Sequence, residues 1–300
     1  KMASSKSLHN FHIPVMGLAY TIDSPIRVAQ YGISSVISII DDELIEKMNS
    51  FYSEKFSLPY QEITKKAKDY RAERITSYLN LVDTVVKDKF SQFKTELSES
   101  KLALDNFMAT LPNSSSIKEG LLSLLDEGTA IKDTIKNYLE THLKAGDIIT
   151  KVDKENFEKG EQLDIAYHDA HASLRGFAQS KLSSSVVLSA GMNPRLYSYF
   201  ENFKDFFPDA NGVLKKKIIL KVSDYRSATI QGKFLAKKGL WVSEYRIESG
   251  LNCGGHAFAT EGFLLGPILE EFKTKKSELI QDTHDVFIKG LSLKELPIPT

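Results

Sequence analysis

The residues best suited to chemistry stand together in one short stretch, from Glu244 to His256. Within it, Gly254 and Gly255 directly precede His256, and Glu248 lies near the end of a strand-like segment. Two residues without side chains let the backbone approach a flat or charged ligand closely. An imidazole titrates near neutral pH, so it can take up or release a proton there. The stretch therefore predicts an enzyme site in which the His256 imidazole is placed for proton transfer.

Each polar residue of this region also has a structural interpretation. Carbonyls of the loop could accept the ring hydrogen bonds of His256, and Lys221 could simply end an amphipathic strand. Glu248 either orients His256 or a ligand, or pairs with Arg246 or Lys221. Cys253 has no basic neighbour in the sequence, so we interpret it as a packing residue rather than a nucleophile.

A second group of polar residues, His168, Asp169 and His171, resembles part of a metal site. The two histidines share one side of a helix if the segment is helical, but no further ligand pair stands at a fixed spacing. We therefore predict a surface pair and no metal site.

The segments that would position these residues alternate between strand and helix patterns. The predicted strands are, in chain order, residues 13–19, 33–40, 185–189, 217–222 and 241–247. Ser24 before Pro25, and Asn193 before Pro194, are typical of helix starts. Strands that alternate with helices form parallel sheets, in which ligands bind at the carboxyl ends of the strands.

Between about Asp42 and Ser180 the strand pattern is absent, and apolar residues recur at helical spacing. We expect an all-helical insertion there. The predicted organisation is 1–42 as the start of the sheet domain, 43–182 as the helical insertion, 183–283 as the resumed sheet domain and 284–300 as a tail.

Composition indicates an ordinary globular chain. The 300 residues carry 39 basic and 39 acidic side chains, so no broad positive field invites nucleic acid. No apolar run is long enough to span a membrane, and the single cysteine fits a reducing compartment. We predict a cytoplasmic protein with a small-molecule substrate, no nucleic acid or membrane partner, and homo-oligomerisation as an open possibility.

Three stretches together resemble a known family of flavoenzymes. They are the joint from Gly17 to Pro25, the run Lys221-Val222-Ser223 followed by Ala228, and Glu248 to His256. They are similar to the FMN-dependent barrels of the nitronate monooxygenase, or 2-nitropropane dioxygenase, family. The resemblance implies an α/β fold of the (β/α)8 TIM-barrel type, represented by its first five βα units and interrupted by the large all-helical insertion.

The family pattern also implies an activity and roles for individual residues. It implies an FMN-dependent monooxygenase in which His256 takes the proton from the carbon beside a nitro group. The backbone of Gly17 and Leu18 would lie against the flavin ring, with Lys221 beside it. The full set of cofactor-binding residues implied is Gly17, Leu18, Lys221, Glu248, Gly254 and Gly255.

The sequence departs from the family after its last predicted helix. Members of that family have further strands after the stretch that matches Gly254 to His256, with glycine-rich turns that hold the flavin phosphate, and no such turns are found here. We therefore expect the chain to be the N-terminal portion of a longer protein and to bind flavin weakly by itself. Two alternatives stay open: a flavin-dependent enoyl-acyl carrier protein reductase-like enzyme, or a non-catalytic barrel scaffold with a helical interaction module.

Overall fold

The computed structural model of the chain describes residues 8–126, 132–152, 157–158, 161–162, 169–248 and 265–299. The chain divides into two compact units. Unit 1 comprises Lys1–Met2, Arg71–Glu73 and Thr150–Thr300, and unit 2 comprises Ala3–Tyr70 and Arg74–Ile149.

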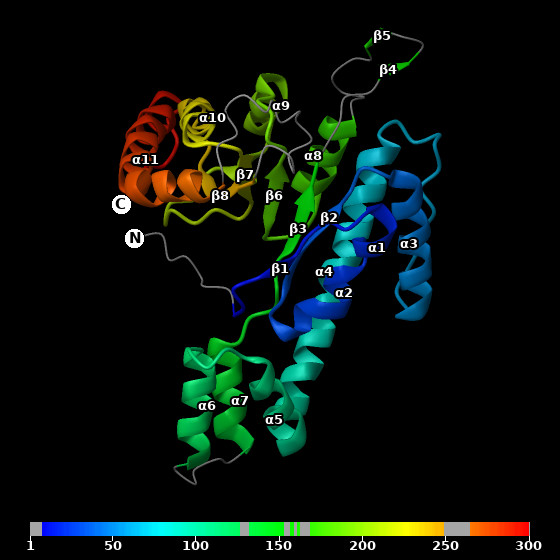
Figure 1. The fold of residues 1–300 in the computed structure, drawn as a ribbon. Coiled ribbons are helices and arrows are strands. Elements are labelled where there is room, and N and C mark those ends of the chain that lie inside the picture. The colour runs from blue at the N-terminus through cyan, green and yellow to red at the C-terminus, as the bar shows by residue number, and fades with distance from the viewer. Residues whose placement is uncertain are drawn as a thin grey trace. The chain divides into compact units, whose positions relative to one another are not determined.

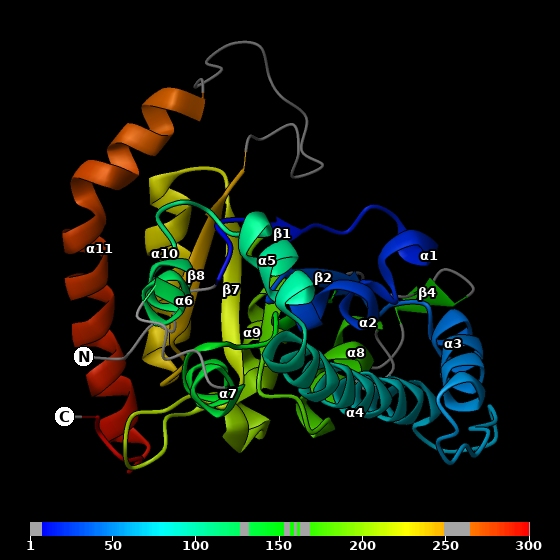
Figure 2. The same cartoon turned by 90° about the horizontal axis from the view of Figure 1, so that it is seen from below.

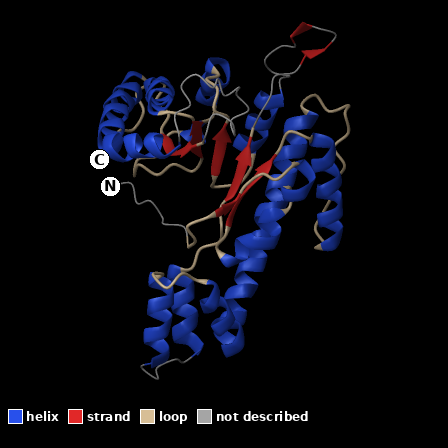
Figure 3. Cartoon of the chain, in the orientation of Figure 1, coloured by secondary structure: helices blue, strands red, loops and turns tan. Residues whose placement is uncertain are grey.

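Six strands follow one another in a single sheet, in the order β1-β2-β3-β6-β7-β8 (Figures 1 and 3). They are β1 (His12–Ile13), β2 (Ser34–Ser38), β3 (Ile148–Lys151), β6 (Ser185–Leu188), β7 (Lys217–Val222) and β8 (Val242–Ile247). The pairs β1–β2, β3–β6, β6–β7 and β7–β8 are parallel. A separate antiparallel pair is formed by β4 (Phe157–Glu158) and β5 (Glu161–Gln162).

This sheet shows that the predicted TIM-barrel fold is wrong. We expected the first five strands of an eight-stranded barrel, whereas the described residues form a six-stranded sheet with β1 and β8 at its two ends. Within this sheet, the strand missed by the sequence analysis is β3, inside the segment 43–182 that was predicted to be all-helical; the short strands β4 and β5 of the separate pair lie in the same segment. Its residues Ile148, Ile149 and Thr150 are β-branched and buried, as strand residues often are. A four-residue strand is too short to show a periodic pattern beside long helices.

Unit 2 combines β1 and β2 with helices, of which α1 and α2 contact β2. In chain order they are α1 (Leu18–Thr21), α2 (Ser24–Val28), the 3-10 helix η1 (Ala29–Tyr31), α3 (Asp42–Lys55), α4 (Tyr70–Glu99), α5 (Lys101–Thr110), α6 (Ser116–Asp126) and α7 (Lys132–His142). Arg71–Glu73 of α4 belong to unit 1. In Figures 1 and 2, α2 lies alongside α4.

The start of α2 differs in detail from the prediction. Ser24 is the first helical residue rather than the cap, and the N-cap position is taken by Asp23. The Asp23 carboxylate does not bind the helix amides. It accepts hydrogen bonds from Arg27 and from the hydroxyl of Tyr52, at 2.5 Å in each case. The helical stretch ends at Gly32, which adopts φ +76° after η1, a conformation that glycine takes readily at a helix end.

One glycine fixes the entry into β3 within unit 2. The amide of Gly146 donates to the carbonyl of Ala29 at 2.8 Å. A Cβ atom at this position would lie 1.9 Å from the carbonyl oxygen of Ile33. Only glycine lets the chain pass so close to the backbone that leads into β2.

Unit 1 places helices beside β6, β7 and β8. They are α8 (Asp169–Gln179), α9 (Pro194–Tyr199), the 3-10 helices η3 (Phe200–Asn202) and η4 (Lys204–Phe206), α10 (Tyr225–Lys237) and α11 (Leu265–Leu293). Helix α10 contacts β7, β8 and α11, and α10 and α11 lie side by side in both views (Figures 1 and 2). Asn193 caps α9 as predicted, since its side chain accepts from the amide of Leu196 at 3.0 Å.

A buried lysine closes the end of α8. Lys216 is 0% exposed, and its ammonium group donates to the carbonyls of Phe177, Ser180 and Leu182 at 2.8, 3.0 and 2.9 Å. These carbonyls lie at the C-terminal end of the helix, where the partial negative charge of the helix dipole favours a cation. Lys216, the middle residue of the triple lysine at 215–217, therefore serves the packing of unit 1, whereas Lys215 and Lys217 are exposed.

Candidate functional site

Strands β7 and β8 carry different kinds of side chain on the two faces of the sheet. Successive side chains of a strand point to opposite faces, and the register pairs Lys221 with Arg246 and Leu220 with Tyr245. A Cβ atom at Gly232 of α10 would lie 2.1 Å from the Tyr245 hydroxyl. The Tyr245 face is therefore the one packed on α10, and Lys221 and Arg246 lie on the opposite face.

The face that carries Tyr245 is buried and apolar. Removal of the phenol from water raises the pKa of Tyr245 to about 12. Leu220 and Val222 of β7 share this face and are buried. This half of the sheet thus has an ordinary helix-covered side.

The opposite face carries an ion pair at the carboxyl end of the two strands. The ammonium of Lys221 lies 3.0 Å from a carboxylate oxygen of Glu248, and the two side chains are 20% and 24% exposed. Glu248 directly follows β8, and its amide still donates to the carbonyl of Val222 at 2.9 Å. The backbone ladder therefore holds Glu248 beside the end of β7. We name the face formed by Lys221, Glu244, Arg246 and Glu248 the charged face.

A bulge in β8 brings these residues onto one face. Ile218 pairs with Val242 but Ile219 pairs with Glu244, so the register skips Ser243. Without the extra residue, Lys221 would be opposite Tyr245 instead of Arg246. Bulges redirect side chains in this way and are frequent beside active sites.

A second ion pair continues the charged face toward the middle of β8. The Arg246 guanidinium lies 2.6 Å from a carboxylate oxygen of Glu244. Arg246 is largely buried in this pair, whereas Glu244 is about half exposed. Parallel sheets normally bear apolar side chains on both faces, so four charged groups on one face, from the middle of β8 to the carboxyl ends of β7 and β8, are unusual. Ligands of open parallel sheets bind at this end of the strands.

The structure thus brings together two of the predicted cofactor-binding residues, Lys221 and Glu248. The structural alternative for Glu248, pairing with Lys221, is confirmed. Sequence analysis did not predict that Glu244 and Arg246 share this face, because the bulge that aligns them leaves no mark in the residue pattern.

Gly17 and Leu18, two further predicted residues, belong to unit 2. Gly17 stands between β1 and α1 with φ +108°, a conformation that residues with side chains rarely adopt. The exposed side chains of Met16 and Tyr20 flank it. The conformation agrees with the expectation that glycine is needed here. Leu18 is the first residue of α1, and its side chain lies outside the described part of the structure.

The remaining predicted residues, Gly254, Gly255 and His256, lie in segment 249–264, outside the described residues. Cys253, in the same segment, and His168, in segment 163–168, also lie outside the described residues. His171 lies in α8 and is buried, with its ring 4.8 Å from that of Tyr199, so the predicted surface position of this histidine is wrong. Among the described residues there is no group of three or more histidine, cysteine, aspartate or glutamate side chains that could hold a metal ion.

Comparisons with models of protein families, with curated proteins and with solved structures give no match to this chain. In the part of the chain that the structure describes, no helix is both long enough and apolar enough to cross a membrane.

Proposed function

We propose that the protein is an FMN-dependent oxidoreductase of the nitronate monooxygenase type, acting on a small substrate with an acidic C–H bond. One observation carries the proposal: the Lys221–Glu248 pair, 3.0 Å apart, lies at the carboxyl ends of β7 and β8, directly before the segment that contains Gly254, Gly255 and His256. The resemblance of that segment to the flavoenzyme family supplies the identity of the cofactor.

The charged face suits the polar edge of a flavin ring. Lys221 is a half-buried cation on the side of the sheet away from α10, and a cation in a partly desolvated site interacts strongly with negative charge. Bound FMN would supply the group that accepts two electrons from the substrate. Lys221 would offer its ammonium to the ring edge, and Gly254 and Gly255 would allow close approach of the backbone.

His256 would take the proton from the carbon beside the nitro group. A base with a pKa near neutrality matches this task. Glu248 holds the ammonium of Lys221 at the strand end, so that the positive charge stays fixed while the substrate anion forms. Arg246 lies on the same face, where its guanidinium is paired with Glu244.

Turnover of a nitroalkane tests this function. The protein, mixed with FMN, is expected to consume dioxygen with nitroethane in the absence of a nicotinamide, and His256→Ala is expected to lose turnover while FMN binding is kept. Full activity of His256→Ala would contradict the role of this residue. Turnover only of an enoyl thioester with a nicotinamide would support the reductase alternative instead.

A further inference from the structure

Two neighbouring pockets of unit 2 share Lys89 of α4. The first, which we name the cationic pocket, has a volume of about 560 Å³ and is lined by residues that include Asp23, Arg27, Phe51, Lys55 and Lys89. The second, which we name the aromatic pocket, has a volume of about 640 Å³ and is lined by residues that include Phe11, Tyr31, Lys89, Gln92, Phe93 and Phe107. Both volumes fall within the range of small-molecule sites, roughly 300–1,000 Å³.

The cationic pocket carries positive charge that the protein does not compensate. Arg27 is neutralised by Asp23, which leaves Lys55 and Lys89. Among the described residues, neither lysine forms an ion pair. The ammonium of Lys89 donates to the carbonyl of Ile26 at 2.5 Å. Burial, and then the charge of Lys55, lower the pKa of Lys89. A bound anion would relieve the repulsion between these two ammonium groups.

The aromatic pocket offers ring surfaces and side-chain amides. The Tyr31 and Phe93 rings meet edge to face at 5.1 Å, and Phe93 meets Phe107 in the same way at 5.4 Å. Phe11 and Tyr31 leave 53% and 40% of their surface exposed. The amides of Gln30, Gln92 and Asn106 also line the pocket. Each amide both donates and accepts hydrogen bonds, as the edge of a nucleobase does.

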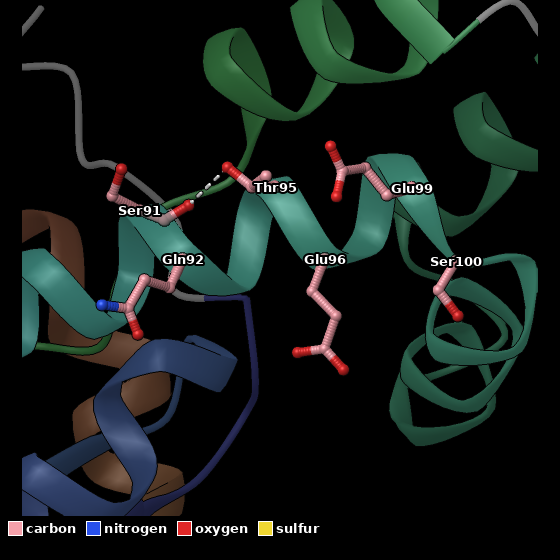
Figure 4. A pocket seen from close by; sticks show the side chains of 6 residues that line it. All are labelled: Ser91, Gln92, Thr95, Glu96, Glu99 and Ser100. Atoms are coloured by element: carbon pink, nitrogen blue, oxygen red, sulfur yellow. Dashed lines mark hydrogen bonds between the residues drawn. The ribbon is translucent and has the colours of Figure 1, made fainter.

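Helix α4 contributes residues to both pockets, with Lys89 common to the two. Lys89, Gln92 and Glu96 follow at spacings of three and four residues, so they share one face of the helix. Figure 4 shows Gln92 and Glu96 pointing to the same side of α4, while Thr95 and Glu99 point to the other side. Lys89 and Gln92 are therefore neighbours on this face of α4, and both line the aromatic pocket.

From this arrangement we propose that unit 2 binds a phosphorylated planar heterocycle, with a nucleoside monophosphate as the ligand. The phosphate would lie between Lys55 and Lys89. The base would stack on the exposed rings of Phe11 and Tyr31, with its polar edge at Gln92. Stacking on aromatic side chains accommodates any base. The two lysines would form charge-assisted hydrogen bonds with the phosphate and so favour a phosphorylated ligand.

FMN has the same chemistry, a planar heterocycle with a phosphate, so the test must distinguish it from a nucleotide. Separate calorimetric titrations of the full chain with adenosine monophosphate, adenosine, inorganic phosphate and FMN make this distinction. We expect adenosine monophosphate to bind more tightly than adenosine or phosphate alone. Lys89→Met is expected to weaken this binding about tenfold, since it removes a charge-assisted hydrogen bond, and to leave adenosine binding nearly unchanged.

Matched variants on the same helix serve as controls. Lys87 is exposed and pairs with Asp83, so Lys87→Met is expected to keep full affinity. Gln92→Ala, at an exposed position that leaves the core intact, is expected to weaken adenosine monophosphate binding about tenfold, and Thr95→Ala is expected to leave it unchanged.

Three results would overturn the proposal. The first is no binding of adenosine monophosphate to the unaltered chain. The second is equal affinity for adenosine monophosphate in Gln92→Ala and Thr95→Ala. The third is tighter binding of FMN than of adenosine monophosphate, with FMN binding lost in Lys89→Met but kept in Lys221→Met. That result would place the flavin site in unit 2. The adenosine monophosphate titration does not depend on the proposed function, because it succeeds or fails without flavin.

Discussion

Replacement of Lys216 by methionine is the sharpest test of how unit 1 is held together. Methionine keeps the length and apolar stem of the side chain but removes the ammonium that bonds three carbonyls. The carbonyl of Phe177 would still accept from the hydroxyl of Ser180 at 2.7 Å. The carbonyls of Ser180 and Leu182 would lose the bonds from Lys216.

The expected cost follows from these two carbonyls. A buried acceptor that loses its partner costs about 1–3 kcal/mol, and the variant gains part of this back because an ammonium no longer has to be desolvated. We therefore expect a net loss of about 3 kcal/mol in the free energy of unfolding of unit 1. With a typical urea dependence, the unfolding midpoint would fall by about 1–2 M urea.

Urea titration followed by tryptophan fluorescence measures this loss. Trp241 is the single tryptophan of the chain and lies in unit 1, with its ring 5.2 Å from that of Phe287. The matched control is Lys215→Met, because Lys215 is 49% exposed and pairs with Asp205 at the surface. The control is expected to change stability by less than about 1 kcal/mol. Equal midpoints for Lys216→Met and Lys215→Met would refute the reasoning.

Two further predictions concern unit 2. Gly146→Ala would force a Cβ atom against the Ile33 carbonyl and is expected to destabilise the unit by about 3 kcal/mol in chemical denaturation followed by circular dichroism; Gly191→Ala, with open space around it, is the control, and equal effects would contradict the contact. Burial, followed by the hydrogen bond to Asp23, raises the pKa of Tyr52 to about 12. Because the unfolded chain ionises this phenol near pH 10, its contribution to stability is full below pH 10 and is lost as the pH rises toward 12. Tyr52→Phe should therefore remove one late step from the alkaline absorbance titration, and an unchanged titration would argue against the buried hydrogen bond.

The strands predicted after residue 180 were largely right, whereas the predicted strand 13–19 is wrong beyond Ile13, because β1 ends there and α1 begins at Leu18. The predicted strand 217–222 matches β7, and the predicted strand 241–247 differs from β8 by one residue. The eight-stranded barrel was inferred from a resemblance of strand ends, which does not determine how many strands a sheet contains. Strand β3 was missed because its four residues follow a long helical stretch. The close approach at Gly146 was a signal visible only in three dimensions.

The candidate site was predictable only in part. The placement of Lys221 and Glu248 together at the carboxyl ends of the strands follows from parallel strand topology. Lys221 was one of the two ion-pair partners considered for Glu248. The roles of Glu244 and Arg246 depend on the bulge at Ser243, which reverses the side-chain alternation of β8 relative to β7. The two pockets of unit 2 combine residues from five separate segments of the chain, and such convergence cannot be read from local spacing.

Titration of the protein with FMN, followed by quenching of flavin fluorescence, tests the central claim most directly. The account predicts that FMN binds, that Lys221→Met weakens binding about tenfold through loss of a charge-assisted contact, and that Lys217→Met, at the exposed start of the same strand, leaves it unchanged. No binding of FMN to the unaltered chain, or equal affinity in Lys221→Met and Lys217→Met, would contradict a flavin site on the charged face.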